Sequence, residues 1–183
     1  MFKRILAAVD GSPASNAGLR SAVELAADQR ATLLLLHVVD DTTVTAGFEG
    51  GFTIPNYIDT LYDALRSSGR KVLARAEAAA KAAGVECKPV LVESRAATFA
   101  HVVVGQAKSL KADLIVLGTH GRRGLRRVLM GSDAEAVVRE ANVPVLLVRG
   151  AAARGRKASS PARGPALLAK SGRSSGKLAQ PGA

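Results

Sequence analysis

Sulfur and aromatic rings are nearly missing from this sequence. Its 183 residues include one cysteine, no tryptophan and only 3% aromatic residues. The single cysteine, Cys87, forms no internal disulfide and is too little for a zinc site of the thiolate type, so we interpret it as a small buried or half-buried residue. The shortage of aromatic rings predicts an aliphatic core and leaves no aromatic surface on which nucleic-acid bases could stack.

Long hydrophobic runs are missing as well. No stretch approaches the roughly 20 apolar residues that a membrane helix needs. The first nine residues imitate a signal peptide, but the five apolar residues Ile5–Val9 are fewer than the about 7–15 of a secretory segment. We therefore expect a cytoplasmic chain with no membrane partner.

Acidic residues are absent from residues 151–183, which hold seven Lys and Arg and therefore most of the formal net charge of +11. Ala, Gly, Ser, Pro, Lys and Arg dominate this segment, which lacks the apolar periodicity that could offset its ordering entropy. We expect a nucleotide-binding domain over residues 1–150 and a basic disordered tail over residues 151–183. The tail leaves binding of nucleic acid or of an acidic partner open as an alternative function.

Short apolar runs recur along the first 150 residues, with helical spacing between them. Each run is nearly continuous, as expected for a strand that is buried on both faces of a parallel sheet. The runs are Ile5–Val9, Leu33–Val39, Val90–Val92, Leu114–Leu117 and Val145–Val148. Because strands and helices alternate, the sequence predicts an α/β fold: one doubly wound, five-stranded parallel sheet with helices on both faces.

Two helix starts carry capping residues. Ser12-Pro13 predicts an N-cap followed by proline at the first helical position. Ser132 and Glu135 have the spacing of a capping box, which predicts Ser132 as the N-cap of the last helix.

The longest helix is expected to run from about Asp59 to Ala83, where Gly84 ends it. Before it, Asp40–Asn56 is rich in threonine and glycine, and we interpret it as a long mobile loop. Its place after the second strand puts it beside the carboxyl edge of the sheet.

A glycine-rich segment, Gly118–Ser132, begins where the fourth apolar run ends and finishes where the last helix begins. Glycines let the backbone approach an anion, consecutive N–H groups can point at it, and the helix dipole adds positive charge. If the first strand neighbours the fourth, a ligand crevice lies between Asp10 and Gly118. Asp10 then accepts hydrogen bonds from ribose hydroxyls or only shapes its turn, and the residues favour neither role.

The common phosphate motifs are absent. The sequence contains no P-loop pattern, and its first strand-to-helix turn lacks the dinucleotide fingerprint. The spacing Gly118-x2-Gly121-x9-Gly131-Ser132, however, is similar to the G-2x-G-9x-G-(S/T) signature of ATP-binding universal stress proteins. Further blocks that resemble this family are Ile5–Ser12, Leu36–Val38, Ala112–Gly121 and Pro144–Val148, so the resemblance covers roughly residues 1–149.

The resemblance implies a Rossmann-like sheet with strand order 3-2-1-4-5 and a bound adenine nucleotide, ATP with or without Mg²⁺. It places adenine near Ala8 and Val38 and the ribose at Asp10. It also implies a stress-response protein that forms a homodimer through its last strand, Val143–Arg149. The phosphate-binding residues implied are Gly118, Thr119, His120, Gly121, Arg122, Arg123, Gly124, Gly131, Ser132 and Asp133.

Some of these residues carry a second interpretation. Asp133, where the family usually has a small or apolar residue, repels a triphosphate unless Mg²⁺ or arginine intervenes, but it also suits a helix N-terminus. Arg122 and Arg123 are phosphate ligands, or part of a solvated loop or a surface for an acidic partner. We interpret His120 as a loop residue that contributes backbone, and the two remaining histidines, His37 and His101, as structural.

The function predicted first is regulatory: nucleotide occupancy alters a dimer or partner surface with little or no turnover. An alternative is a slow ATPase or a self-phosphorylating enzyme with Thr119 or Ser132 as acceptor, although no base for rapid phosphoryl transfer is evident. We further expect that valine at Gly118 or Gly131 abolishes ATP binding with the fold intact, because its side chain would fill the space of the phosphates. If these glycines only shape the loop, the substitutions would instead destabilise the fold without a selective loss of binding.

Overall fold

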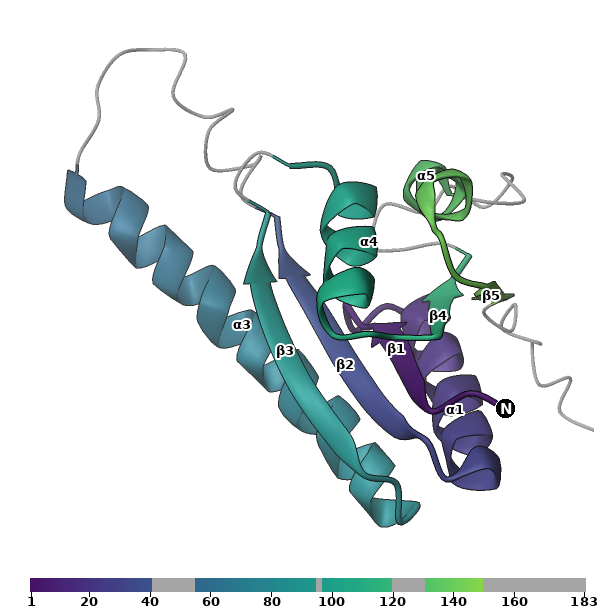
Figure 1. The fold of residues 1–183 in the computed structure, drawn as a ribbon. Helices are drawn as coiled ribbons and strands as arrows, with labels where there is room; N and C mark the ends of the chain where they lie inside the picture. The colour runs from purple at the N-terminus through teal and green to yellow at the C-terminus, as the bar shows by residue number, and fades with distance from the viewer. Residues whose placement is uncertain (41–54, 95–96, 120–130, 150–183) are drawn as a thin grey trace, which may run out of the picture. The chain divides into compact units, whose positions relative to one another are not determined.

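Five parallel strands lie side by side in the order β3-β2-β1-β4-β5 in the computed structural model (Figure 1). The structure describes residues 1–40, 55–94, 97–119 and 131–149. The predicted fold class and strand order are therefore confirmed. The strands are β1 (Arg4–Ala8), β2 (Thr32–Val39), β3 (Cys87–Glu93), β4 (Leu114–Gly118) and β5 (Val145–Val148).

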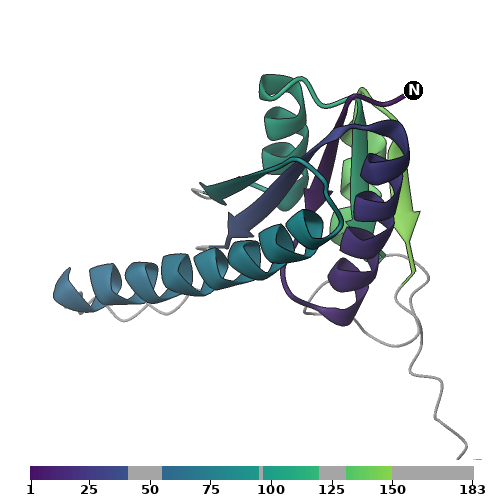
Figure 2. The same ribbon diagram turned by 90° about the horizontal axis from the view of Figure 1, so that it is seen from below.

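Two pairs of helices cover the two faces of the sheet (Figures 1 and 2). Helices α1 (Pro13–Gln29) and α3 (Pro55–Ala82) pack on one face, and α4 (Phe99–Ser109) and α5 (Ser132–Glu140) lie on the other. Among the described residues, no helix combines the length and the apolar character that crossing a membrane requires.

Consecutive residues of each central strand belong to opposite layers of the core. Ile5 and Ala7 of β1 face α1 and α3, whereas Leu6 faces α4 and α5. In β2, Leu33 and Leu35 join the first layer, and Leu34 and Leu36 join the second. Both faces of these strands are buried, which is why their apolar runs are continuous in the sequence.

The predicted start of the first helix is confirmed, and the longest helix ends just before Gly84 as predicted. Ser12 is the N-cap of α1: its hydroxyl accepts a hydrogen bond of 3.1 Å from the Ser15 N–H, and Pro13 follows at the first helical position. At the end of α3, Gly84 has a φ of +70°, and its N–H donates to the Lys81 carbonyl at 2.9 Å. A left-handed glycine of this kind ends a helix without steric cost.

The predicted start of α3 is wrong. The helix begins at Pro55 and not near Asp59, so Pro55 and Asn56 do not belong to the preceding loop. Proline is favoured in the first turn of a helix, where its missing N–H has no partner to lose. The remainder of the predicted loop, residues 41–54, and the predicted tail, residues 151–183, lie outside the described residues.

Candidate functional site

The carboxyl edge of the sheet brings the predicted site residues together. Strand β1 pairs with β2 on one side and with β4 on the other. The chain leaves β1 for α1 on one face and leaves β4 for α5 on the opposite face. This is the topological switch point at which open α/β sheets bind ligands. Ala8, Val38 and Gly118 lie at or near the ends of the three strands, and Asp10 follows β1.

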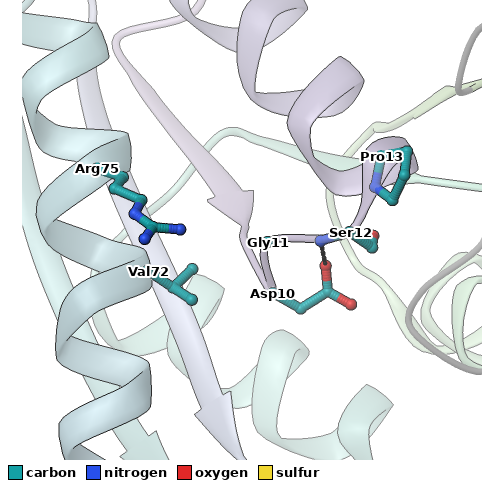
Figure 3. Close-up of a pocket in the computed structure, with 6 residues that line it drawn as sticks. All are labelled: Asp10, Gly11, Ser12, Pro13, Val72 and Arg75. Atoms are coloured by element: carbon teal, nitrogen blue, oxygen red, sulfur yellow. Dashed lines mark hydrogen bonds between the residues drawn. The ribbon is translucent and has the colours of Figure 1, made fainter.

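Asp10 is held within a network of hydrogen bonds at the start of α1. Its Oδ1 accepts from the Ser12 N–H at 2.8 Å (Figure 3). Its own N–H donates to the Ser15 hydroxyl at 3.0 Å. Gly11 between them has a φ of +80°, which glycine adopts without strain. Asp10 thus shapes its turn, which is one of the two roles considered for it. A carboxylate has about four acceptor positions, so this role is compatible with binding of ribose hydroxyls.

The segment predicted to bind phosphates is fixed at both of its ends. The Gly131 N–H donates to the Thr119 carbonyl at 2.8 Å, and the Thr119 N–H donates to the Val148 carbonyl of β5 at 2.9 Å. Residues 120–130 therefore leave and rejoin the fold at one point, between the end of β4 and the start of α5. The predicted ligands His120, Gly121, Arg122, Arg123 and Gly124 lie outside the described residues.

The first turn of α5 presents its backbone donors without a side-chain cap. The predicted capping box is wrong: Gly131, not Ser132, is the N-cap, and its carbonyl accepts from the Glu135 N–H at 3.0 Å. Glycine has no side chain with which to occupy the N–H groups of the first turn. Ser132 and Asp133 are exposed beside these groups. A helix start of this kind suits an anion through its N–H groups and its dipole, whereas Asp133 opposes one.

Gly118 contacts a helix and not an empty crevice. A Cβ atom at this position would lie 2.5 Å from the Ala14 carbonyl carbon and 2.7 Å from the Ser15 nitrogen of α1. Gly18 of α1 faces the same place, since a Cβ there would lie 3.2 Å from the Gly118 nitrogen. The expectation that valine at Gly118 leaves the fold intact is therefore wrong, because the space beside it is filled by backbone.

A hollow lies on the α3 side of the Asp10 turn (Figure 3). It has a volume of about 410 Å³, with Val72 and Arg75 of α3 opposite residues 10–13. The residues that line the hollow do not include the start of α5, so the hollow is separate from the predicted phosphate site. The hydrogen bonds of Thr119 and Gly131 lie at the predicted phosphate site. Sequence reasoning did not find Val72 or Arg75 here, because only the packing of α3 brings them beside β1.

His37, which we interpreted as structural, is hydrogen-bonded to the residue that precedes Asp10. Its ring is buried, and Nδ1 lies 2.6 Å from the carbonyl oxygen of Val9, the residue before Asp10. A carbonyl only accepts hydrogen bonds, so Nδ1 carries the proton and donates it. Sequence reasoning also missed Gly69 of α3, which faces this ring. An isolated glycine inside a helical pattern was the available signal.

Cys87 is half-buried at the start of β3, as expected for a structural thiol. Burial raises the pKa of this thiol above its ordinary value, and the nearby carboxylate of Glu77 adds to the effect. A raised pKa favours the neutral thiol, which is a poor nucleophile. The described residues also contain no group of three or more His, Cys, Asp or Glu side chains that could hold a metal ion.

Comparison with known proteins agrees with this fold. The sequence profile of the Universal stress protein family matches residues 1–149. The chain is 34% identical to a universal stress protein of Bacillus subtilis, with 81% of this chain and 100% of the relative aligned. It is 37% identical to a universal stress protein A homolog of Coxiella burnetii, over 80% of this chain and 96% of the relative. A crystal structure from the family, from Burkholderia pseudomallei, is 37% identical and superposes with a TM-score of 0.62, covering 80% and 95% of the two chains.

Proposed function

Because this chain belongs to the universal stress protein family, we propose that it binds an adenine nucleotide, with ATP as the preferred ligand, at the edge between β1 and β4. Adenine nucleotides are bound by other proteins of this fold: a universal stress protein in complex with cAMP, and a family protein of Arabidopsis thaliana with AMP bound. The proposed contacts are adenine near Ala8 and Val38, ribose at Asp10, and phosphates against the start of α5.

The observation that carries the proposal is the paired bonding of Thr119. Its carbonyl accepts from Gly131 and its N–H donates to Val148, so the glycine-capped start of α5 is anchored to the end of β4. Strand β4 is the direct neighbour of β1, after which Asp10 follows. A phosphate donor set and a carboxylate suited to ribose thus share one switch point, as a nucleotide requires.

We propose a regulatory role with little turnover. Phosphoryl transfer needs a group that positions the attacking water or hydroxyl, whereas the contacts proposed above assign the Asp10 carboxylate to the ribose. One observation favours self-phosphorylation as a second candidate. Ser132 is exposed at the start of α5, whereas Thr119 is buried, so Ser132 is the better of the two predicted acceptors.

Calorimetric titration of the full chain with ATP, AMP, cAMP and GTP tests the proposal. We expect saturable binding of ATP that exceeds the binding of GTP, and no more than a slow release of phosphate under excess Mg·ATP. Intact-mass analysis after the incubation reports any phosphate on Ser132. If the wild-type chain binds none of the adenine nucleotides, the proposal is wrong.

We also propose a homodimer through Val143–Arg149. The two edges of the sheet differ: β3 carries exposed Lys88 and Pro89, a charge and an imino acid that discourage further pairing. Strand β5 has neither, and Leu146 on it is 38% exposed. Apolar surface on an unprotected edge favours pairing with a second copy.

Leu146→Glu is expected to convert the dimer to a monomer with little loss of thermal stability. Leu147 is unsuitable for this test because it packs against the core beneath α4 and α5. Sedimentation velocity at micromolar concentration measures the change, and Lys88→Glu at the opposite edge is the matched control. A wild-type chain that sediments as a monomer would contradict the proposed dimer.

A further inference from the structure

Both the N–H and the carbonyl of Val9 are hydrogen-bonded to residues of β2. Its N–H donates to the Leu36 carbonyl at 2.8 Å, and its carbonyl accepts from His37 Nδ1 at 2.6 Å. Val9 lies beyond the last residue of β1, where the regular pairing with β2 has ended. The last peptide before Asp10 is therefore hydrogen-bonded to a side chain of β2, that of His37, and not only to its backbone.

The His37 ring is itself fixed by α3. A Cβ atom at Gly69 would lie 2.6 Å from His37 Cδ2, 3.1 Å from Nε2 and 2.7 Å from a methyl carbon of Leu91. The helix thus comes so near to the sheet that only glycine fits above the ring. Glycine is less favourable than alanine inside a helix, so α3 is less stable by itself with glycine at this position, which leaves room for the imidazole.

An ion pair also joins α3 to the end of β3. Arg66, one turn before Gly69, donates from Nε to the Glu93 carboxylate at the end of β3, at 2.7 Å. Its Nη1 also donates to Asp63 at 3.0 Å. Hydrogen bonds to these two carboxylates raise the pKa of Arg66 above its ordinary value. The helix, the ring and the Val9 peptide form a continuous series of contacts that ends at Asp10.

We infer that His37 is a positioning residue for the nucleotide site: held under Gly69, it donates to the Val9 carbonyl and thereby fixes the Asp10 turn for binding of ribose hydroxyls. The inference rests on the proposed function. The carboxylate of Asp10 is oriented on its other side by the Ser12 N–H. Without His37, the Val9 carbonyl loses this hydrogen bond, the turn is held less tightly, and Asp10 spends less time in the geometry that two ribose hydroxyls require.

Three substitutions of His37 distinguish the effect of its hydrogen-bond donor from the effect of its size. In asparagine the amide nitrogen is attached to Cγ, as Nδ1 is in histidine, so His37→Asn is expected to keep ATP affinity within about twofold. His37→Leu and His37→Gln, which remove or displace the donor, are expected to weaken ATP binding about five- to tenfold, the scale of one lost hydrogen bond. Calorimetric titration measures the affinities, and thermal melts identify any variant that does not fold.

Gly69→Ala tests the same contact from the helix side. It improves helix propensity, yet its Cβ atom must displace the His37 ring, so we expect weaker ATP binding. Gly105→Ala in α4 is the matched control, because a Cβ atom there meets nothing within 4 Å. If Gly69→Ala binds ATP as tightly as Gly105→Ala does, the inference is wrong.

Titration with 2′,3′-dideoxy-ATP decides whether His37 acts through ribose recognition. The wild-type chain is expected to prefer ATP over this analogue, and His37→Leu and Asp10→Ala should each reduce the preference. In the Asp10→Ala background, His37→Leu should have little further effect. A merely structural role would instead weaken both ligands equally in both backgrounds, which would overturn the inference while the proposed function stands. A wild-type chain that binds neither ligand would overturn both.

Discussion

Gly118→Val is expected to destabilise the whole domain, with loss of nucleotide binding as a secondary result. The new Cβ atom would lie within 2.7 Å of three backbone atoms at the start of α1, and backbone cannot rotate away as a side chain can. Overpacking of this kind costs typically 1–3 kcal/mol and more where nothing yields. At about 3 kcal/mol, a domain of this size should lose roughly 6–12 °C in its melting temperature.

Differential scanning calorimetry without nucleotide measures this effect. Gly105→Ala provides the control, since an added methyl group there meets no neighbour within 4 Å. Gly118→Ala should already show most of the loss, because the clash begins at Cβ. A Gly118→Val protein that melts with the wild type would show that α1 does not approach β4 as closely as described.

Gly131→Val is expected to abolish ATP binding, by a hundredfold or more, while the domain remains folded. Gly131 has a φ of −72° and a ψ of 150°, a conformation that any residue adopts. Its N–H still reaches Thr119, and its carbonyl still begins α5. The valine side chain, however, would stand beside the uncapped N–H groups against which we place the phosphates. Valine is a poorer N-cap than glycine, so a stability loss of about 1 kcal/mol is also expected.

Thr98→Val supplies the control for that stability loss. Thr98 caps α4 through a hydrogen bond of 3.2 Å from the His101 N–H, and α4 follows β3, two strands away from β1. This variant should lose a similar amount of stability and bind ATP normally. Calorimetric titration beside thermal melts compares the two variants. Normal ATP affinity in folded Gly131→Val would mean that the start of α5 does not bind the phosphates.

The fold was predictable because two kinds of signal agree along the chain. Continuous apolar runs mark strands that are buried on both faces, and residues such as Ser12 and Gly84 mark helix ends through local backbone chemistry. Strand β3 begins three residues earlier than predicted, since exposed Lys88 and Pro89 interrupt its apolar run. The strand order came from the resemblance to a family, because the pattern of apolar residues does not state which strands are neighbours.

The sequence predicted that Asp10 and Gly118 meet at one edge of the sheet, but not the structural role of each glycine. Gly118 and Gly131 are equivalent glycines in the motif, but their roles differ. Gly118 allows α1 to pack closely against β4, whereas Gly131 is the N-cap of α5. Only the distances between elements that are remote in sequence separate these roles. The same limit applies to Gly69 and His37, whose contact joins a helix and a strand that the sequence pattern treats independently.

The hydrogen bond between Thr119 and Gly131 also makes the segment between them exchangeable. Its two ends already meet at one point of the fold, so its length and composition can change without moving β4 or α5. Loop closure adds only about 0.6 kcal/mol for each doubling of length, so even a substantial insertion costs little stability. Residues 120–130 can therefore be replaced by those of a relative while β4 and α5 keep their places.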